Sequence, residues 1–246
     1  MIRYNFIDNI KGLSFFFMLI HHIFYFYDIV NNTSYTKNPY IIRCGSIARN
    51  IFIFMVGFTL VYTYNNNKLT QKKFIYKRIN ASFKILFHAL LITLITYYYF
   101  PSKYIRFGVL HFIGLSTLIL ILILPFKQLY YILLIILIFL LICTKRINNP
   151  YNLLKYKKIS INPFLDIIIG QTNPSYPMID WFPLLSWVPI VLLGMITANN
   201  INNNYINNNL NFNNIITWTG RNSLYLYTFH VYLLIILYNL NRRINN

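Results

Sequence analysis

The feature of this sequence that most constrains its fold is a series of long apolar runs that contain no charged side chain. The runs are Gly12–Tyr27, Asn50–Asn67, Ile85–Ser102, Phe107–Phe126, Gln128–Thr144, Trp181–Ala198 and Asn222–Asn241. Each is close to the ~20 residues that a membrane-spanning helix requires. Because hydrocarbon offers no partner to backbone N–H and C=O groups, such runs have to be helical. The sequence therefore predicts an all-α fold, a polytopic membrane helix bundle with about seven transmembrane helices.

The composition agrees with a membrane protein. Hydrophobic residues make up 57% of the chain and charged residues only 11%, which is more apolar than a soluble domain of this length needs. The first run contains bulky aromatic residues and no small-residue cleavage site, so we interpret it as a retained helix rather than a secretory signal. Cys44 and Cys143 lie in different segments without partner spacing, which indicates neither a disulfide framework nor a metal site.

The charge balance is strongly basic, with 22 Lys and Arg against four acids and a formal net charge of +18. Most basic residues stand in short loops beside the apolar runs, where anionic lipid headgroups are the nearest counter-charge. We therefore expect contact with membrane lipids and not with nucleic acid. By the positive-inside rule, Arg3, Lys11 and the basic residues between 68 and 84 place the N-terminus in the cytosol. The basic residues between 145 and 158, together with Arg242 and Arg243, run against that rule.

The chain is expected to form one membrane domain over residues 1–246. Its only sizeable insertion is the stretch of about 145–179. The apolar piece Phe164–Gly170 within it is too short to span, so we expect a surface segment or a lid. The Asn-rich stretch Asn199–Asn214 is interpreted as a polar linker.

The polar residues inside the apolar runs are the candidates for function. Five histidines lie in or beside these runs, at positions 21, 22, 88, 111 and 230. A His in hydrocarbon is expensive unless it faces the interior of the bundle. His21 and His22 stand about 100° apart around a helix, so at most one of them faces a given partner. For His88, which no motif surrounds, we expect a neutral ring hydrogen-bonded to a neighbouring helix.

Around the other histidines the residues form ordered blocks. The blocks are R-x4-D-x2-K-G-x5-M-x3-H over residues 3–22, Phe52, Phe54 and Gly57 in the second run, RFGVLHFIG over residues 106–114, DWFP over residues 180–183 followed by Trp187 and Gly194, and GRNSL over residues 220–224 followed by Tyr227 and His230. The first block combines a charged cluster at a helix entrance with an imidazole deeper in the same helix. That arrangement suits an anionic ligand that enters from the cytosolic end.

In this order the five blocks resemble the catalytic membrane domain of heparan-α-glucosaminide N-acetyltransferase, and most closely the shorter bacterial members of that family. The resemblance covers nearly the whole chain. It implies transfer of an acyl group, typically acetyl, from cytosolic acetyl-CoA or another acyl-CoA to an acceptor, often a sugar, at the opposite face. A His suits this chemistry because its imidazole takes a proton or carries an acyl group near neutral pH. No metal is expected.

The resemblance also implies roles for individual residues. The candidate catalytic residues are His22, His111 and Asp180. The candidates for binding the CoA donor are Arg3, Lys11, Arg49 and Arg221. The candidates for binding the acceptor are Trp181, Asn222, Tyr227 and His230. We further expect His22 to line an internal cavity that His111 approaches, and Asp180 to pair with Arg221 or an imidazole.

The chain departs from the family pattern in three places. The animal enzyme uses a His in the loop after the first helix, whereas this chain has none between Asp28 and His88, so His22 is the candidate. Lys11 replaces an Arg and keeps the charge without the bidentate fork, and Ser186 replaces the Pro before a Trp. A non-catalytic binding or transport protein on the same scaffold stays open as the alternative, as do a structural or assembly role and a homodimer.

Overall fold

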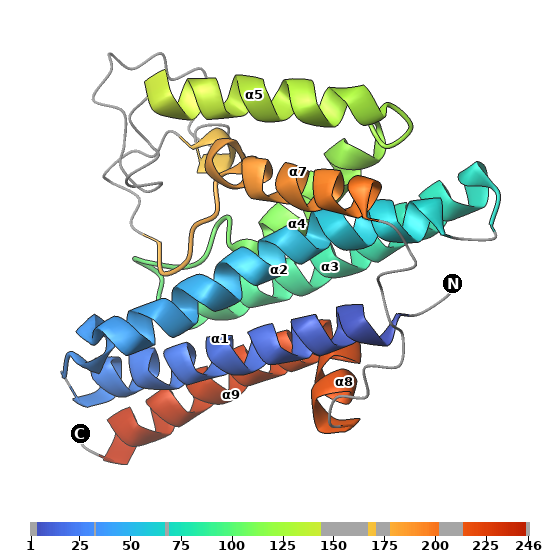
Figure 1. The fold of residues 1–246 in the computed structure, drawn as a ribbon. Coiled ribbons are helices and arrows are strands. Elements are labelled where there is room, and N and C mark those ends of the chain that lie inside the picture. Colours follow the sequence, from blue (N-terminus) through green and yellow to red (C-terminus); the bar gives the residue numbers. More distant parts are fainter. Residues whose placement is uncertain are drawn as a thin grey trace. The chain divides into compact units, whose positions relative to one another are not determined.

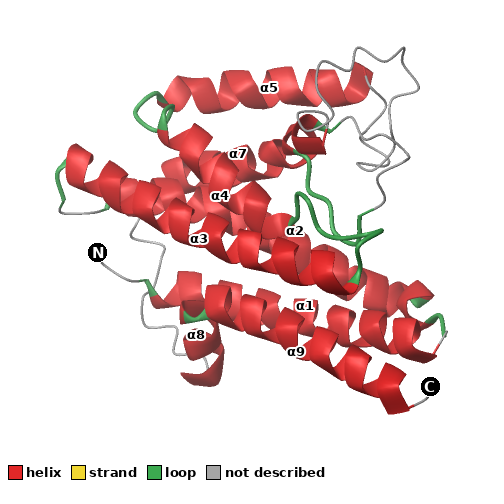
Figure 2. Ribbon diagram, turned by 180° about the vertical axis from the view of Figure 1, so that it is seen from behind, coloured by secondary structure: helices red, strands yellow, loops and turns green. Residues whose placement is uncertain are grey.

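The computed structural model describes residues 4–31, 33–66, 69–143, 167–170, 178–201 and 214–244. Its helices are α1 (Asn5–Asn31), the short 3-10 helix η1 (Tyr35–Lys37), α2 (Pro39–Asn65), α3 (Gln71–Tyr99), α4 (Val109–Ile121), α5 (Lys127–Cys143), α7 (Leu184–Asn200), α8 (Asn214–Arg221) and α9 (Ser223–Ile244). Within these ranges there is no β-strand, only an isolated bridge between Phe107 and Trp181 (Figure 2). The all-α prediction is confirmed, and most of the expected insertion at 145–179 lies outside the described residues.

Each apolar run lies largely within a helix, but several helices begin well before their run. Helix α2 begins at Pro39, and α3 begins at Gln71. Proline is favoured at the first helical position, where its missing N–H would have no intrahelical partner. Lys and Arg are good helix formers, so α3 includes the basic residues that precede its charge-free run. Absence of charge therefore marks what hydrocarbon can accommodate, not where a helix starts.

Four helices are long and apolar enough to cross a membrane. They are Asn5–Asn31, Pro39–Asn65, Gln71–Tyr99 and Ser223–Asn241. The remaining expected spans correspond to α4, α5 and α7, whose 13, 17 and 17 residues extend about 20 to 26 Å, less than the ~30 Å hydrocarbon core. The chain is thus an integral membrane protein, and the count of about seven spans stays a prediction.

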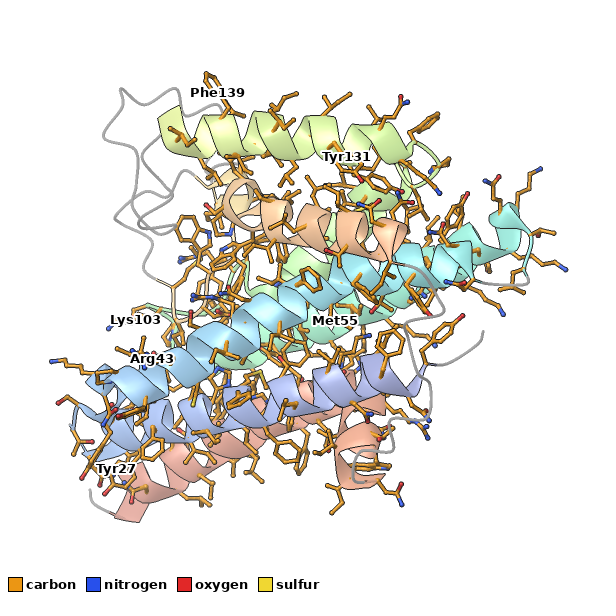
Figure 3. The ribbon with its side chains drawn as sticks, viewed as in Figure 1. Tyr27, Arg43, Met55, Lys103, Tyr131 and Phe139 are labelled. Atoms are coloured by element: carbon orange, nitrogen blue, oxygen red, sulfur yellow. The ribbon has the colours of Figure 1, made fainter. Side chains whose placement is uncertain are left out.

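Large apolar side chains point outward from the helices, as a lipid-facing surface requires. On α5, Phe139 projects from the side opposite α7 (Figure 3). Ile135 of the same helix is 67% exposed. In water such a surface would be costly. In a bilayer it contacts acyl chains, so the burial pattern agrees with the membrane assignment.

The chain divides into two compact units, and the boundary lies within α2. One unit comprises Val56–Asn200, and the other comprises Ile2–Met55 together with Ile201–Asn246. The second unit therefore joins the two ends of the sequence. It contains α1, η1, the first part of α2, α8 and α9, which include His22 and five of the candidate donor- and acceptor-binding residues, namely Lys11, Arg49, Arg221, Tyr227 and His230.

Helix α1 is the centre of the second unit, where α9 runs beside it in the same direction and α8 packs against its first turns (Figure 1). Asp8, Gly12, Phe15 and His22 recur at spacings of three, four and seven residues, which places them on one face of α1. This face meets α8 and α9. A second face meets α2, where the Ser14 hydroxyl donates to the Ala48 carbonyl at 2.8 Å.

The other unit contains the rest of α2 with α3, α4, α5 and α7. Helix α3 packs along α4, and α5 packs along α7. Two glycines of the family blocks stand at close approaches, Gly57 against the Val191 carbonyl and Gly114 against Leu86. Arg78 of α3 donates a hydrogen bond to Thr63 of α2, so a basic residue of this long helix is held by a neighbouring hydroxyl.

Gly220 offers a test of the contact between α8 and α1. A Cβ at this position would overlap the backbone carbonyl of Asp8, which cannot move aside as a flexible side chain can. We expect Gly220→Ala to lower the unfolding free energy by about 1 to 3 kcal/mol, the usual cost of overpacking. The measurement is thermal unfolding of the purified protein in detergent.

A loss of stability would be specific to the contact. Helix propensity alone predicts the opposite, because Ala is a better helix former than Gly by up to about 1 kcal/mol. Asn80→Ala, at an exposed position inside α3, is the matched control and should leave the midpoint unchanged or raise it. A Gly220→Ala protein as stable as wild type would contradict the close contact.

Candidate functional site

Two histidines from opposite ends of the sequence meet inside the second unit. His22 Nδ1 on α1 lies 2.8 Å from His230 Nε2 on α9. The ring planes are within 12° of parallel, with centroids 5.1 Å apart, so the hydrogen bond joins the edges of the two rings. His230 is buried and His22 is half-buried. Both residues lie within candidate membrane spans.

The partners of His230 determine which nitrogen carries each proton. His230 Nδ1 lies 3.1 Å from the Leu226 carbonyl oxygen, which can only accept, so Nδ1 is the donor. In a neutral imidazole the other nitrogen is then an acceptor, and His230 Nε2 accepts from His22 Nδ1. The same rule leaves an unshared electron pair on His22 Nε2. Among the described residues this nitrogen has no hydrogen-bond partner.

Aromatic rings hold His230 in this orientation. Phe15 of α1 and Tyr227 of α9 both meet it edge to face, with centroids 5.7 and 5.2 Å away. Phe15 belongs to a buried cluster with Met18 and Ala48, and Tyr227 packs against that cluster. The imidazole pair is therefore set in a packed apolar surround.

His21 points to a different neighbour, as the angle between adjacent helical positions requires. A Cβ on Gly45 of α2 would lie 2.5 Å from His21 Cδ2, so the His21 ring occupies the space that this glycine leaves. Arg49 stands four residues further along α2, on the same helical face. It is half-buried, and its Nη2 donates to the Ser46 hydroxyl at 3.3 Å.

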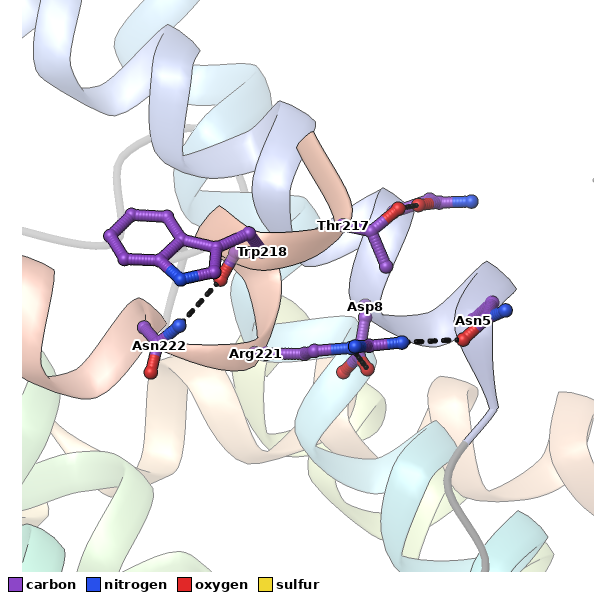
Figure 4. Close-up of polar contacts among 7 residues, drawn as sticks. Asn5, Asp8, Thr217, Trp218, Arg221 and Asn222 are labelled. Carbon is purple, nitrogen blue, oxygen red and sulfur yellow. Dashed lines mark hydrogen bonds and ion pairs between the residues drawn. The ribbon is translucent and has the colours of Figure 1, made fainter. Parts of the chain in front are cut away.

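A polar corner lies at the start of α1 (Figure 4). Arg221 of α8 donates from Nε to Asp8 Oδ2 at 3.4 Å and from Nη2 to Asn5 Oδ1 at 2.9 Å. Next to it, the Thr217 hydroxyl donates to Asn9 Oδ1 at 2.5 Å. Close approach of the two helices requires glycine at positions 12 and 220, where a Cβ would overlap a backbone carbonyl.

This corner and the histidine pair lie at different depths along α1. Asp8 and His22 are fourteen residues apart, which corresponds to about 21 Å along a helix axis. A ligand that contacts both must therefore be long, with an anionic part at the corner and a reactive group at the histidines.

Asp180 lies in the other unit, at the beginning of α4. Its Oδ2 accepts a hydrogen bond from the Val109 N–H at 3.1 Å, one of the N–H groups without an intrahelical partner. A carboxylate at this end also interacts favourably with the helix dipole. Gly108 permits the approach, because a Cβ there would lie 2.6 Å from Asp180 Oδ2. This contact accounts for the glycine in the block at 106–114 and for the acid at the start of the DWFP block.

His111 also lies at the start of α4, and both of its ring nitrogens form hydrogen bonds within the protein. Nδ1 accepts from the Gly108 N–H at 3.3 Å, as the third residue of a capping box does. The Thr93 hydroxyl donates to the Ile105 carbonyl at 2.8 Å, so its contact with His111 Nε2 at 3.2 Å has Nε2 as donor. His111 is thus the opposite tautomer from His22, and this geometry favours a structural role for its ring.

Two extended segments run beside each other next to the start of α4. The Ile179 N–H donates to the Lys103 carbonyl at 3.0 Å, and the Phe182 N–H donates to the Phe107 carbonyl at 2.9 Å. Between them Trp181 forms the isolated bridge with Phe107, and its indole Nε1 donates to the Ile167 carbonyl at 2.8 Å. The DWFP block therefore runs beside the FGVLH block, in the same direction.

The remaining predicted site residues are placed as follows. Arg3 lies outside the described residues, and Lys11 is half-buried on α1, one turn beyond Asp8. The Asn222 amide donates to the Trp218 carbonyl at 2.9 Å across the junction of α8 and α9. Because His22 and Arg221 belong to one unit and His111 and Asp180 to the other, a shared cavity and a pairing of Asp180 with Arg221 stay predictions. In the described ranges no three His, Cys, Asp or Glu side chains gather as a metal site.

Comparison with known proteins identifies the family of this chain. The profile of the family described as heparan-alpha-glucosaminide N-acetyltransferase, catalytic, matches residues 3–232. The chain belongs to this family. No curated protein and no solved structure matches it. The resemblance that the five blocks indicated is confirmed, and the heparan-α-glucosaminide N-acetyltransferase family is one of membrane acetyltransferases, in keeping with the candidate spans.

The sequence blocks indicate candidate residues, but they do not show how these residues pair. His22 and His230 are 208 positions apart, and nothing in one sequence connects them. The contacts of Asn5 and Asn9 with α8 were missed for the same reason. Helix α8 had a signal in the sequence, because helical spacing puts apolar Ile215, Ile216 and Trp218 on one side and polar residues such as Thr217 and Arg221 on the other.

Asp180 provides the test for this subsection. Asn can accept the hydrogen bond from the Val109 N–H, whereas Ala cannot. We expect Asp180→Ala to lose about 0.5 to 2 kcal/mol of stability, as helix-capping residues do, while Asp180→Asn stays close to wild type. Thermal unfolding in detergent measures the difference.

Equal losses in both variants would refute the capping role. Transfer assays on the same two proteins address the carboxylate separately. A loss of acyl transfer in Asp180→Asn, at wild-type stability, would assign the negative charge itself to the chemistry.

Proposed function

We propose that this protein transfers an acyl group, typically acetyl, from acyl-CoA at the cytosolic face to a sugar or similar acceptor at the opposite face. His22 is the central catalytic residue. The observation that carries the proposal is the hydrogen bond of His22 to His230, because it leaves an electron pair on His22 Nε2 inside a candidate membrane span. Ionisable groups in such a position are expensive and usually functional.

His22 Nε2 can serve in either of two ways. As a general base it takes the proton from the acceptor hydroxyl or amine while that group attacks the thioester carbonyl. The new C–O or C–N bond forms, the C–S bond breaks, and the proton passes from His22 to the CoA thiolate. In the second way Nε2 attacks the thioester itself, the C–S bond breaks and CoA leaves as thiolate. The acceptor then attacks the acyl-imidazole, the bond from the acyl carbon to Nε2 breaks, and the acceptor's proton passes to the CoA thiolate.

The donor is proposed to lie along α1. Lys11 and Arg221 at the polar corner, together with Arg3, provide positive charge for the CoA phosphates. The corner is also the end of α1 that the positive-inside rule assigns to the cytosol. Arg49 lies about 15 Å from the start of α2, near His21, and is proposed to contact the donor close to its acyl end.

The acceptor is proposed to use Trp181, Asn222 and Tyr227, and Asp180 is proposed to assist the transfer. These assignments follow the family blocks. Hydrogen bonds to backbone groups fix the orientation of the Asp180, Trp181 and Asn222 side chains. For His111 the same kind of bonding supports an indirect part, in which it fixes the start of α4.

The function is tested by replacing single histidines. We expect His22→Ala to reduce acyl transfer by roughly 10²-fold to 10⁴-fold, the usual contribution of a positioned acid–base group, while the protein stays inserted and folded. His88→Ala is the matched control in another span and should retain transfer. The assay follows release of free CoA from acetyl-CoA with a panel of amino sugars, sugars and lipids as acceptors.

His21→Ala and the His21/His22 double variant complete the series, because His21 is adjacent and its ring is directed to Gly45. Full activity of the double variant would remove α1 from the chemistry. Binding of acetyl-CoA by wild type without turnover on any acceptor would instead support the non-catalytic alternative.

Incubation with radiolabelled acetyl-CoA and no acceptor distinguishes the two chemical routes. An acyl-imidazole route leaves label on the protein, released by hydroxylamine and absent in His22→Ala. A general-base route leaves the protein unlabelled.

A further inference from the structure

His230 has no polar atom left for a substrate. Its Nδ1 donates to the Leu226 carbonyl, and its Nε2 accepts from His22. The ring edges and faces are occupied by Phe15 and Tyr227, and the side chain is buried. The acceptor-binding role that the family pattern implied for this residue therefore has no group to perform it.

We infer that His230 is a positioning residue, which uses the chain of hydrogen bonds from Leu226 through His230 to His22 to hold the His22 proton on Nδ1 and so makes Nε2 the reacting nitrogen. This inference rests on the proposed function for its consequence in catalysis. The hydrogen-bond chain itself is a property of the folded protein, and it is measurable without turnover.

The direction of the chain follows from its fixed end. A carbonyl oxygen cannot donate, so the order of donors from His22 to His230 to Leu226 has one solution while both rings are neutral. An imidazole without such a partner favours the proton on Nε2 in water, which would block that nitrogen as a base or nucleophile. His230 thus selects the tautomer that an unsupported His22 would populate least.

The pair also assists His22 when it becomes charged. A protonated His22, or one that carries an acyl group on Nε2, still has a proton on Nδ1 to donate, and His230 Nε2 remains its acceptor. The hydrogen bond then has a charged donor and is stronger than in the resting state. Stabilisation that grows as the reaction proceeds is what accelerates a chemical step.

His230 differs from His111 in a way that makes the inference specific. His111 is held as the Nε2–H tautomer by the Gly108 N–H and the Thr93 hydroxyl, and both nitrogens are used within the protein. In the pair of His22 and His230, by contrast, His22 Nε2 has no partner among the described residues. Of these two arrangements, only the pair of His22 and His230 leaves a basic nitrogen available.

The experiment compares His230→Gln with His230→Leu. The Gln amide oxygen can accept from His22 Nδ1, whereas Leu removes the acceptor and keeps an apolar side chain. We expect His230→Leu to lose at least roughly tenfold in kcat, part of the 10²-fold to 10⁴-fold that a positioned base provides, with KM for acetyl-CoA little changed. His230→Gln should recover most of that loss. His88→Gln and His88→Leu are the matched controls and should resemble wild type.

Nitrogen-15 NMR of histidine-labelled protein gives a readout that does not depend on activity. The chain has only five histidines, so single substitutions assign every ring. At a pH where the rings are neutral, we expect His22 to show a protonated Nδ1 and an unprotonated Nε2, with a coupling across the hydrogen bond to His230 Nε2. In His230→Leu the coupling should vanish and the proton should move to Nε2 of His22.

The outcomes separate this inference from the proposed function. An inactive wild-type protein whose His22 shows the Nδ1–H tautomer would keep the positioning role and reject the transferase. An active wild type with His22 protonated on Nε2, or with His230→Leu as active as His230→Gln, would overturn the inference. A His230→Leu protein that fails to fold leaves the wild-type spectrum and the Gln variant to decide, since neither needs the Leu protein.

Discussion

The absence of hydrogen-bonding partners in hydrocarbon governs how this protein is built. Every backbone polar group in a span must be bonded within the protein, so the described chain is helical, and its hydroxyls turn back to helix carbonyls. Thr63, Thr96, Ser82 and Thr228 each donate to a carbonyl one turn earlier. Other polar side chains bond across helices instead. Asp8 with Arg221 and His22 with His230 are two such contacts.

Glycine turns these pairings into specific helix contacts. Without a Cβ at positions 12 and 220, α8 reaches the backbone of α1 closely enough for Arg221 to contact Asp8 and Asn5. Gly45 makes the corresponding space for His21, and Gly108 for Asp180. The association of small residues with polar partners is a general feature of helix packing in membranes. In this protein it brings the family's charged and imidazole residues into contact with defined neighbours.

The chemical character of each histidine follows from the group it faces. His22 and His111 are the same residue type in similar apolar helices, yet their protons lie on different nitrogens because one faces a ring acceptor and the other a backbone donor. Adjacent His21 and His22 are separated by the helical angle and face α2 and α9, respectively. A single residue type thereby provides a proposed reactive group, a positioning group and a structural group.

The sequence by itself determined the membrane class, the helical fold, the family and the residues worth testing. These follow from local properties, namely charge-free length, spacing along one helix face and ordered short blocks, and each is readable without knowing what lies nearby. The starts of α2 and α3 were not readable in this way, because helix formation tolerates the charges that end an apolar run. Only the tertiary structure decided that His22 pairs with His230, that Arg221 meets Asp8, and that Asp180 and His111 cap the start of α4. Those contacts join positions up to 213 residues apart, and they depend on side-chain direction and close backbone approach, which no local pattern encodes.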